Sequence, residues 1–136
     1  FVVQMAADEF RRGLVGVERC IRDRVRLAPG VYQEEVVDYC REKGILLEAW
    51  GPFGQGELFE QKEVQEIAAK HGKSVAQIAL AWSLAESFLP LPKSVTVSRI
   101  QSNLDCFEIE LSKDEREVLK TISVTSGAPR VDEMDF

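Results

Sequence analysis

Three short apolar segments alternate with amphipathic helical patterns along this chain, and this alternation limits its possible folds more than any other feature. The segments cover residues 25–27, 45–49 and 89–91. The middle one is a nearly continuous apolar run, which is typical of a strand that is covered on both faces of a parallel sheet. Strands that alternate with helices predict an α/β fold, with a parallel sheet and helices outside it.

Helix boundaries are marked by end signals in the sequence. Gly44 follows a helical pattern whose first turn is acidic and whose last turn is basic, as expected at a helix C-terminus. Ser74-Val-Ala-Gln77 and Ser112-Lys-Asp-Glu115 have the spacing of capping boxes. The predicted helices cover residues 33–43, 61–70, 74–86, 98 onward and 115–122, with a glycine-rich loop at 51–56 and an extended segment at 107–111.

Length and charge exclude several classes of protein. At 136 residues the chain is long enough for one domain with its own core. Residues 1–136 are therefore interpreted as a single domain that ends in an irregular tail at 124–136. The net charge of −6, from 17 basic and 23 acidic residues, argues against a nucleic-acid partner. No run of about 18 apolar residues is present, so no membrane span is predicted.

The three cysteines, Cys20, Cys40 and Cys106, are an odd number and form no Cys-x-x-Cys pair. This pattern disfavours both a disulfide framework and a zinc site, and it favours reduced thiols. Together with the missing apolar span, it predicts a soluble, cytoplasmic protein without a metal site.

The segment after the third predicted strand contains the residues best suited to bind a phosphate. Lys93, Ser94 and Thr96 occupy the turn, and Ser98 and Arg99 begin the next helix. A strand that continues into a helix through such a turn gathers an ammonium, a guanidinium, hydroxyls and helix N-terminal amides. Taken alone, the pattern fits a βα loop with solvated cations better than a phosphate site.

Three neighbouring stretches change this balance, because together they resemble the C-terminal part of an aldo-keto reductase. They cover residues 44–56, 67–82 and 88–112, and the likeness extends over about 31–123. The resemblance implies part of a (β/α)8 TIM barrel, a fold that takes about 250 residues when complete. It also implies NADP as the cofactor and, only in a complete barrel, a small aldehyde or ketone that NADPH reduces to an alcohol.

The resemblance places a cofactor site at the ends of the second and third predicted strands. There, Trp50 would stack on the nicotinamide, and the glycine loop after it would pass the pyrophosphate. Lys93 and Ser94 would contact the 2′-phosphate, which favours NADP over NAD. The expected cofactor-binding residues are Trp50, Gly51, Phe53, Gly54, Lys93, Ser94, Val95, Arg99 and Asn103. Without the resemblance, Trp50 is more simply a core residue and the glycines form a turn.

Several positions depart from the family pattern. Where the family has an Asn-Gln pair for the nicotinamide amide and then His-Pro, this chain has Asp23, Arg24, Ala28 and Pro29. Ser102 stands where the family often has Glu. These departures weaken the expected nicotinamide contact and one further cofactor contact.

No catalytic residue is expected in this chain. The family's Tyr acid acts with Lys, Asp and His from the N-terminal half of the barrel, whereas Tyr32 and Tyr39 here belong to a predicted helix and its start. His71, the single histidine, lies at a helix C-terminus, where the helix dipole stabilises a cation. The chain is therefore interpreted as the NADP-binding part of a reductase and is expected to be inactive alone.

A non-catalytic function is the alternative. A partial barrel has two open strand edges and an expected apolar inner face, and both favour association. The chain would then be a truncated or split barrel that self-associates, or the retained portion of a longer polypeptide, and would bind the cofactor poorly. The departures at Asp23, Arg24, Ala28 and Ser102 favour this alternative.

Overall fold

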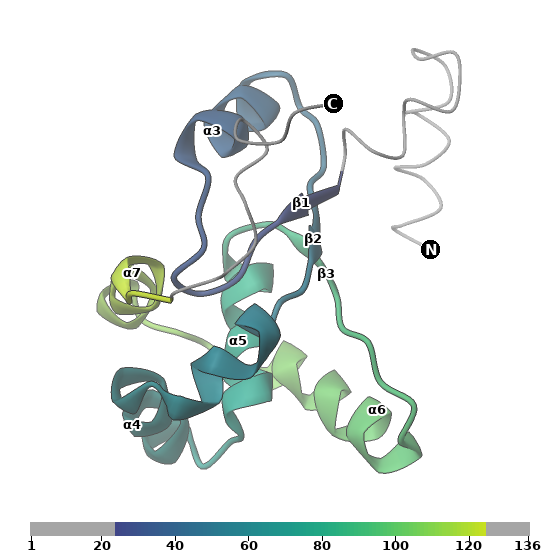
Figure 1. Cartoon of the computed structure of the whole chain (residues 1–136), viewed down its shortest axis with the longest axis vertical. Coiled ribbons are helices and arrows are strands. Elements are labelled where there is room, and N and C mark those ends of the chain that lie inside the picture. The colour runs from purple at the N-terminus through teal and green to yellow at the C-terminus, as the bar shows by residue number, and fades with distance from the viewer. Residues whose placement is uncertain (1–23, 125–136) are drawn as a thin grey trace.

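The computed structural model describes residues 24–124. The expectations for Cys20, Asp23 and residues 125–136 of the tail lie outside this range. Within it, the chain is an α/β unit in which helical segments follow each strand (Figure 1). No helix in this range is long and apolar enough to cross a membrane.

Three parallel strands form the sheet, as the alternating pattern predicts. They are β1 (Arg24–Arg26), β2 (Glu48–Trp50) and β3 (Leu89–Leu91), in the order β1-β2-β3. In register, Arg26, Trp50 and Leu91 form the last row, at the carboxyl ends of the strands. The predicted α/β class with parallel strands is confirmed, and β1 and β3 are the edges of the described sheet.

The middle strand begins later than predicted. Residues 45–47 precede β2, whose first residue, Glu48, is paired in register with Leu89, the first residue of β3. Leu47 is nevertheless buried, and its carbonyl accepts a hydrogen bond from the Leu89 amide at 2.9 Å. The apolar run therefore enters the core even where it is not paired as a strand.

The helices begin and end close to the predicted residues. They are α3 (Glu34–Glu42), α4 (Lys62–His71), α5 (Val75–Ala85), α6 (Val97–Leu104) and α7 (Lys113–Thr121). Both predicted capping boxes form, with Ser74 before α5 and Ser112 before α7. Gly72 follows α4 with a left-handed φ of 62°, which a residue without a Cβ adopts readily.

The glycine-rich segment predicted at 51–56 is only partly a loop. A 3₁₀ segment, η1 (Gly54–Glu60), begins inside it and is kinked by left-handed backbone at Gln55 and Gly56, with φ values of 57° and 100°. A second 3₁₀ segment, η2 (Asp105–Glu108), takes up the start of the segment predicted as extended before α7. The loop and the extended segment were therefore each predicted without the 3₁₀ turn that they contain, a short element that is common in connections between helices and strands.

The core lies between one face of the sheet and the helices. Because strand side chains alternate between faces, Val25 and Ala49 point to the same side, where they pack with Ile78 and Trp82 of α5. In Figure 1, α5 and α4 lie below the strands and α7 lies to their left, whereas α6 lies at the end of the segment that follows β3 and is joined to α5 by the hydrogen bond from Nε2 of Gln77 to the Ser102 carbonyl. This arrangement leaves the opposite face of the sheet without a covering helix among the described elements.

That opposite face carries charged as well as apolar side chains. Alternation places Arg24 and Arg26 of β1 on it, beside Glu48 and Trp50 of β2. The Nε atom of Arg24 donates a hydrogen bond to Oε2 of Glu48 at 2.8 Å. The prediction of an apolar inner face is therefore wrong for the β1 side of the sheet.

Candidate functional site

The predicted cofactor residues fall into two groups that follow neighbouring strands. Trp50 ends β2 and is paired in register with Leu91, the last residue of β3. The segments that leave the two strands therefore start side by side at the carboxyl end of the sheet. In barrels of parallel strands, this end carries the functional site. The two predicted groups therefore start from neighbouring strand ends, and α6, which carries Arg99 and Asn103, lies farther along the segment that leaves β3 (Figure 1).

Trp50 lies at the surface rather than in the core. It is 43% exposed, and the guanidinium carbon of Arg26 lies 5.7 Å from its ring centroid. The indole offers a flat apolar face to a planar ligand at the end of β2. The alternative interpretation of Trp50 as a core residue is wrong, because Trp82 is the tryptophan that fills the core.

The residues after Trp50 differ in how much they can offer a ligand. Gly51 has a left-handed φ of 64°, and no atom lies within 4 Å of the place that a Cβ would occupy. Phe53 packs against the core. Gly54 is buried, and its amide donates to the Gly51 carbonyl at 3.1 Å. Gly51 is therefore open to close approach, whereas Phe53 and Gly54 are engaged in packing and in the turn.

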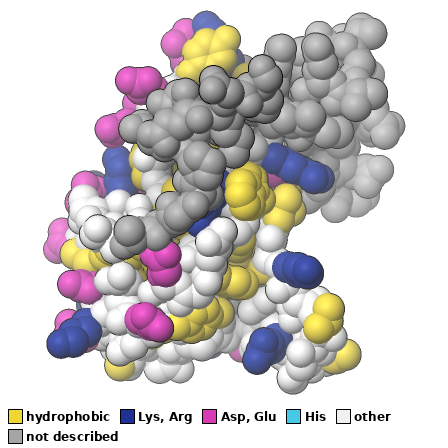
Figure 2. Space-filling model, viewed as in Figure 1, with side chains coloured by type: hydrophobic (Ala, Val, Ile, Leu, Met, Phe, Trp, Pro, Cys, Tyr) yellow, Lys and Arg dark blue, Asp and Glu magenta, His cyan; other side chains and the backbone are white. Residues whose placement is uncertain are grey.

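The segment after β3 presents two cations. Lys93 and Arg99 are exposed, and neither makes a hydrogen bond or salt bridge to another residue in the range 24–124 through its side chain. The hydroxyl of Ser94 accepts a hydrogen bond from the Thr96 amide at 3.4 Å, which holds the turn between them. Figure 2 shows basic side chains, in dark blue, over α6 and the segment before it.

The start of α6 adds backbone donors to these cations. Thr96 precedes the helix with extended backbone, and its side chain makes no capping hydrogen bond. The first amides of the helix are therefore left for solvent or for a ligand. Val95, just before them, is 91% exposed, so nothing apolar shields this end. A helix N-terminus beside two unpaired cations is suited to bind an anion.

Two polar residues lie near the end of α6. The hydroxyl of Ser102 donates to the Arg99 carbonyl at 3.2 Å, and its own carbonyl accepts Nε2 of Gln77 at 2.7 Å. Ser102 is therefore tied to the helix and does not extend toward a ligand as a longer acidic side chain could. Asn103 is half-buried, and its side-chain amide makes no hydrogen bond to another residue of the described range.

The model of the aldo/keto reductase family matches residues 25–123, which is nearly the whole described range. The chain belongs to the aldo/keto reductase family. Glyoxal reductase from Bacillus subtilis is 38% identical to it over 115 residues, which cover 84% of this chain and 42% of that protein.

Solved structures of other aldo/keto reductases give the same result. An aldo/keto reductase from Brucella melitensis superposes with a TM-score of 0.68 and 37% identity, covering 71% of this chain and 37% of its own. A variant of Gox0644 in complex with NADPH superposes with a TM-score of 0.74 and 27% identity. The match covers 83% of this chain and 42% of the Gox0644 chain. This chain therefore spans about two fifths of the length of these relatives, and its fold is part of the TIM barrel that they form.

Two of the departures from the aldo/keto reductase pattern serve the fold here. Arg24 pairs with Glu48 across the sheet. Ala28 is fully buried and exchanges backbone hydrogen bonds with Val31 at 3.2 and 2.8 Å. Neither position offers a neutral side-chain amide.

The side chains that could donate a proton lie away from the carboxyl end of the sheet. The Tyr32 ring lies 6.1 Å from that of Phe88, which precedes β3. Burial raises the pKa of the Tyr32 phenol, and its oxygen is bonded by Nη1 of Arg41 at 3.0 Å. Tyr39 is exposed on α3, and Nε2 of His71 lies 3.2 Å from Oε1 of Glu115 in the outer helices.

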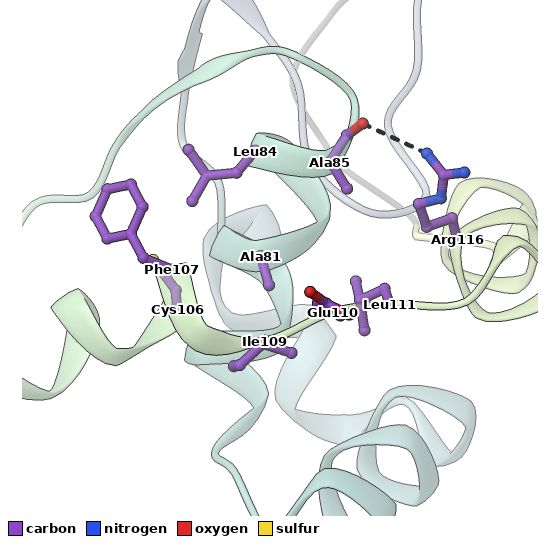
Figure 3. A pocket seen from close by; sticks show the side chains of 9 residues that line it. All are labelled: Ala81, Leu84, Ala85, Cys106, Phe107, Ile109, Glu110, Leu111 and Arg116. Carbon is purple, nitrogen blue, oxygen red and sulfur yellow. Dashed lines mark hydrogen bonds between the residues drawn. The ribbon is translucent and has the colours of Figure 1, made fainter.

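A groove elsewhere in the described part does not coincide with the candidate site. It has a volume of about 500 Å³ and lies between α5 and residues 106–111, as Figure 3 shows. Leu84, Phe107 and Ile109 are among its lining residues. Burial raises the pKa of the Cys106 thiol, which makes it a poor nucleophile. The one cation among its lining residues, Arg116, is already engaged, because its Nη1 donates to the Ala85 carbonyl at 3.4 Å and lies 3.8 Å from Oε1 of Glu86.

The sequence-based prediction missed Arg26. It lies in the last row of the sheet beside Trp50, yet it is only 7% exposed. The signal that could have identified it is a charged residue within a short apolar strand, at a position that shares a face with Trp50. In the described residues no group of three or more His, Cys, Asp or Glu side chains is placed to hold a metal ion.

Proposed function

We propose that this chain is the C-terminal, NADP-binding part of a reductase that converts aldehydes or ketones to alcohols with NADPH. The observation that carries the proposal is the arrangement after β2 and β3, where exposed Trp50 neighbours the segment bearing Lys93 and Arg99. The NADPH complex of the Gox0644 variant supports it, because that protein shares the fold over 83% of this chain.

Each of these groups suits one part of the dinucleotide. Lys93 and the uncapped amides of α6 form an anion site for the 2′-phosphate, and Arg99 adds a planar fork of donors. Ser94 contributes a hydroxyl at the same turn, while Trp50 holds a planar ring by stacking. Bound NADPH would supply the hydride for carbonyl reduction. Two cations at the phosphate end favour NADP over NAD.

The proton donor of the reaction lies, in this proposal, outside this chain. The whole sequence contains only Tyr32, Tyr39 and His71 as tyrosines and histidine, and none of them lies beside Trp50. A reductase therefore requires residues from the rest of a barrel, to which this chain would contribute the cofactor contacts.

We expect NADP to bind to the purified chain and to quench the fluorescence of Trp50. Lys93→Ala is expected to weaken that binding by roughly ten- to hundred-fold, because it removes a charge-assisted contact of about 1.5–3 kcal/mol. Lys62→Ala is the matched control, since Lys62 is an exposed lysine on α4. Equal affinities for the Lys93→Ala variant, the control and the wild-type chain would contradict the assignment.

We also expect the chain alone to show no reductase activity. Mixed with NADPH and a reactive aldehyde such as glyoxal, it should consume NADPH no faster than a solution without protein, since it offers no proton donor at the site. The measurement is the loss of NADPH absorbance with time. Turnover well above background would show that the catalytic machinery is present in these 136 residues.

A self-associating, non-catalytic barrel part is the second candidate, and one observation favours it. Val97, Ile100 and Leu104 share a face of α6 by their spacing, and they are 68%, 48% and 62% exposed. Together with β1 and β3, which have no further strand beside them among residues 24–124, this face is suited to pack against another surface. Sedimentation that depends on protein concentration, combined with no NADP binding, would support this candidate over the first.

A further inference from the structure

Arg26 stands out among the charged residues of the described part of the chain. Only 7% of it is exposed, and its Nε, Nη1 and Nη2 atoms are all buried without a hydrogen-bond partner. Its backbone carbonyl accepts a hydrogen bond from Nε2 of Gln33 at 3.5 Å, but this bond does not involve the guanidinium, whose donors stay unpaired. A buried, unpaired charge is strongly unfavourable, because no group replaces the water that it has lost.

Within residues 24–124, the sheet face around Arg26 provides no carboxylate for it. Glu48, the acidic residue of the neighbouring strand, is already bonded to Arg24 at 2.8 Å. In the next row, Arg26 lies beside Trp50, and its guanidinium carbon is 5.7 Å from the ring centroid. The ring supports the guanidinium by a cation–π contact, but the N–H donors of the guanidinium remain unused.

We propose that Arg26 binds the carboxylate of the carbonyl substrate, so that the substrates are 2-oxo acids rather than neutral aldehydes. That the bound anion is a substrate rests on the function proposed above. Arg26 lies in the last row of the sheet, at the carboxyl ends of the strands, beside the ring assigned to the nicotinamide. A carboxylate bound there brings an adjacent carbonyl group to the same end of the sheet as Trp50.

The chemistry of Arg26 suits a carboxylate better than a further phosphate. A guanidinium donates two parallel hydrogen bonds to a planar carboxylate, and it does so well when packed on an aromatic face. The phosphate end of the dinucleotide already has Lys93, Arg99 and the amides of α6 at the neighbouring segment. The structure therefore offers two separate cationic positions, and we assign the phosphate to the segment after β3 and the carboxylate to Arg26.

The test is a titration of the whole chain with oxamate, a carboxylate that resembles a 2-oxo acid but is not reduced. Oxamate is expected to change the fluorescence of Trp50 and to raise the Tm, whereas the uncharged oxamide should do neither. Arg26→Gln is expected to weaken oxamate binding by roughly ten- to hundred-fold. Arg26→Lys keeps the charge, but it should bind more weakly than wild type because an ammonium lacks the planar fork.

Arg99→Gln is the matched control, because it removes the same charge from the neighbouring segment and should leave oxamate binding unchanged. Loss of binding in Arg99→Gln with retention in Arg26→Gln would overturn the proposal, since oxamate would then bind at the phosphate turn. The proposal would also be overturned if oxamate did not raise the Tm of the wild-type chain and Arg26→Gln had a lower Tm than wild type. That result would mean that a carboxylate of the polypeptide itself pairs with Arg26.

Failure of this proposal is distinguishable from failure of the proposed function. NADP binding is tested with Lys93→Ala and oxamate binding with Arg26→Gln, so each ligand has its own variant. Oxamate binding without NADP binding would refute the cofactor assignment and leave the carboxylate site standing. NADP binding without oxamate binding would refute the carboxylate site alone.

Discussion

Replacing Trp82 with alanine is expected to lower the free energy of unfolding of this chain by about 3–5 kcal/mol. Trp82 is fully buried, and its ring centroid lies 6.2 Å from that of Tyr32 and 6.1 Å from that of Phe88. Its Nε1 also donates to the Arg116 carbonyl at 3.2 Å. The substitution would therefore leave a cavity and remove a hydrogen bond between α5 and α7.

Urea unfolding followed by circular dichroism measures this loss, since that signal does not depend on the removed indole. A domain of this size is stable by about 5–15 kcal/mol, so the expected loss is a large fraction of the total and should shift the urea midpoint clearly. Trp50→Ala is the matched control and should cost less than about 1 kcal/mol, because Trp50 is already 43% exposed. Equal losses in the two variants would contradict the assignment of Trp82 to the core and Trp50 to the surface.

The helices could be predicted from the sequence because their signals are local. Ser74 and Ser112 begin helices through hydrogen bonds to residues three positions away, and Gly72 ends one by its own backbone conformation. The limits of the strands could not be predicted in this way. Where β2 begins depends on the pairing of Glu48 with Leu89, a contact between segments that η1, α4 and α5 separate along the chain.

The parts of the candidate site that depend only on residue type and order along the chain could be predicted. Lys93 and Arg99 follow a strand, and this order alone places them at its carboxyl end. The exposure of Trp50 could not be predicted, because it follows from Ala49 occupying the face that packs on the helices. Arg26 could not be identified as unpaired, since that depends on Glu48 already being bonded to Arg24.

Glu115→Gln is expected to destabilise the chain at neutral pH by about 2–3 kcal/mol. The Glu115 carboxylate joins two helices. Its Oε1 accepts a hydrogen bond from Nζ of Lys70 at 2.7 Å, and Nε2 of His71 lies 3.2 Å from the same oxygen. Its Oε2 accepts the Ser112 amide at 2.8 Å, which completes the capping box of α7. Gln can preserve the capping box, so the loss measures the interaction of the charge with the end of α4.

The same carboxylate makes stability depend on pH in acid. The hydrogen bond from Lys70, followed by that from the Ser112 amide, lowers the pKa of Glu115 from 4.5 to about 2. Because the folded state has the lower pKa, the unfolded state binds the proton first as the pH falls. The contribution of Glu115 is therefore complete above pH 4.5 and is lost between pH 4.5 and about 2. The exposure of the Lys70 ammonium, 69% of its side chain, reduces the size of the effect through solvent screening.

Urea unfolding of both proteins at neutral pH and near pH 2 separates the charge from the cap. The difference between wild type and Glu115→Gln should be largest at neutral pH and should be much smaller near pH 2, where Glu115 of the folded chain is about half protonated. Glu117→Gln is the matched control, because it removes an exposed carboxylate from the same helix and should change stability by less than about 0.5 kcal/mol. A charged contact with Lys70 must weaken as the carboxylate becomes neutral. If the stability difference between wild type and Glu115→Gln were the same at both pH values, the charge of Glu115 would therefore contribute nothing to stability.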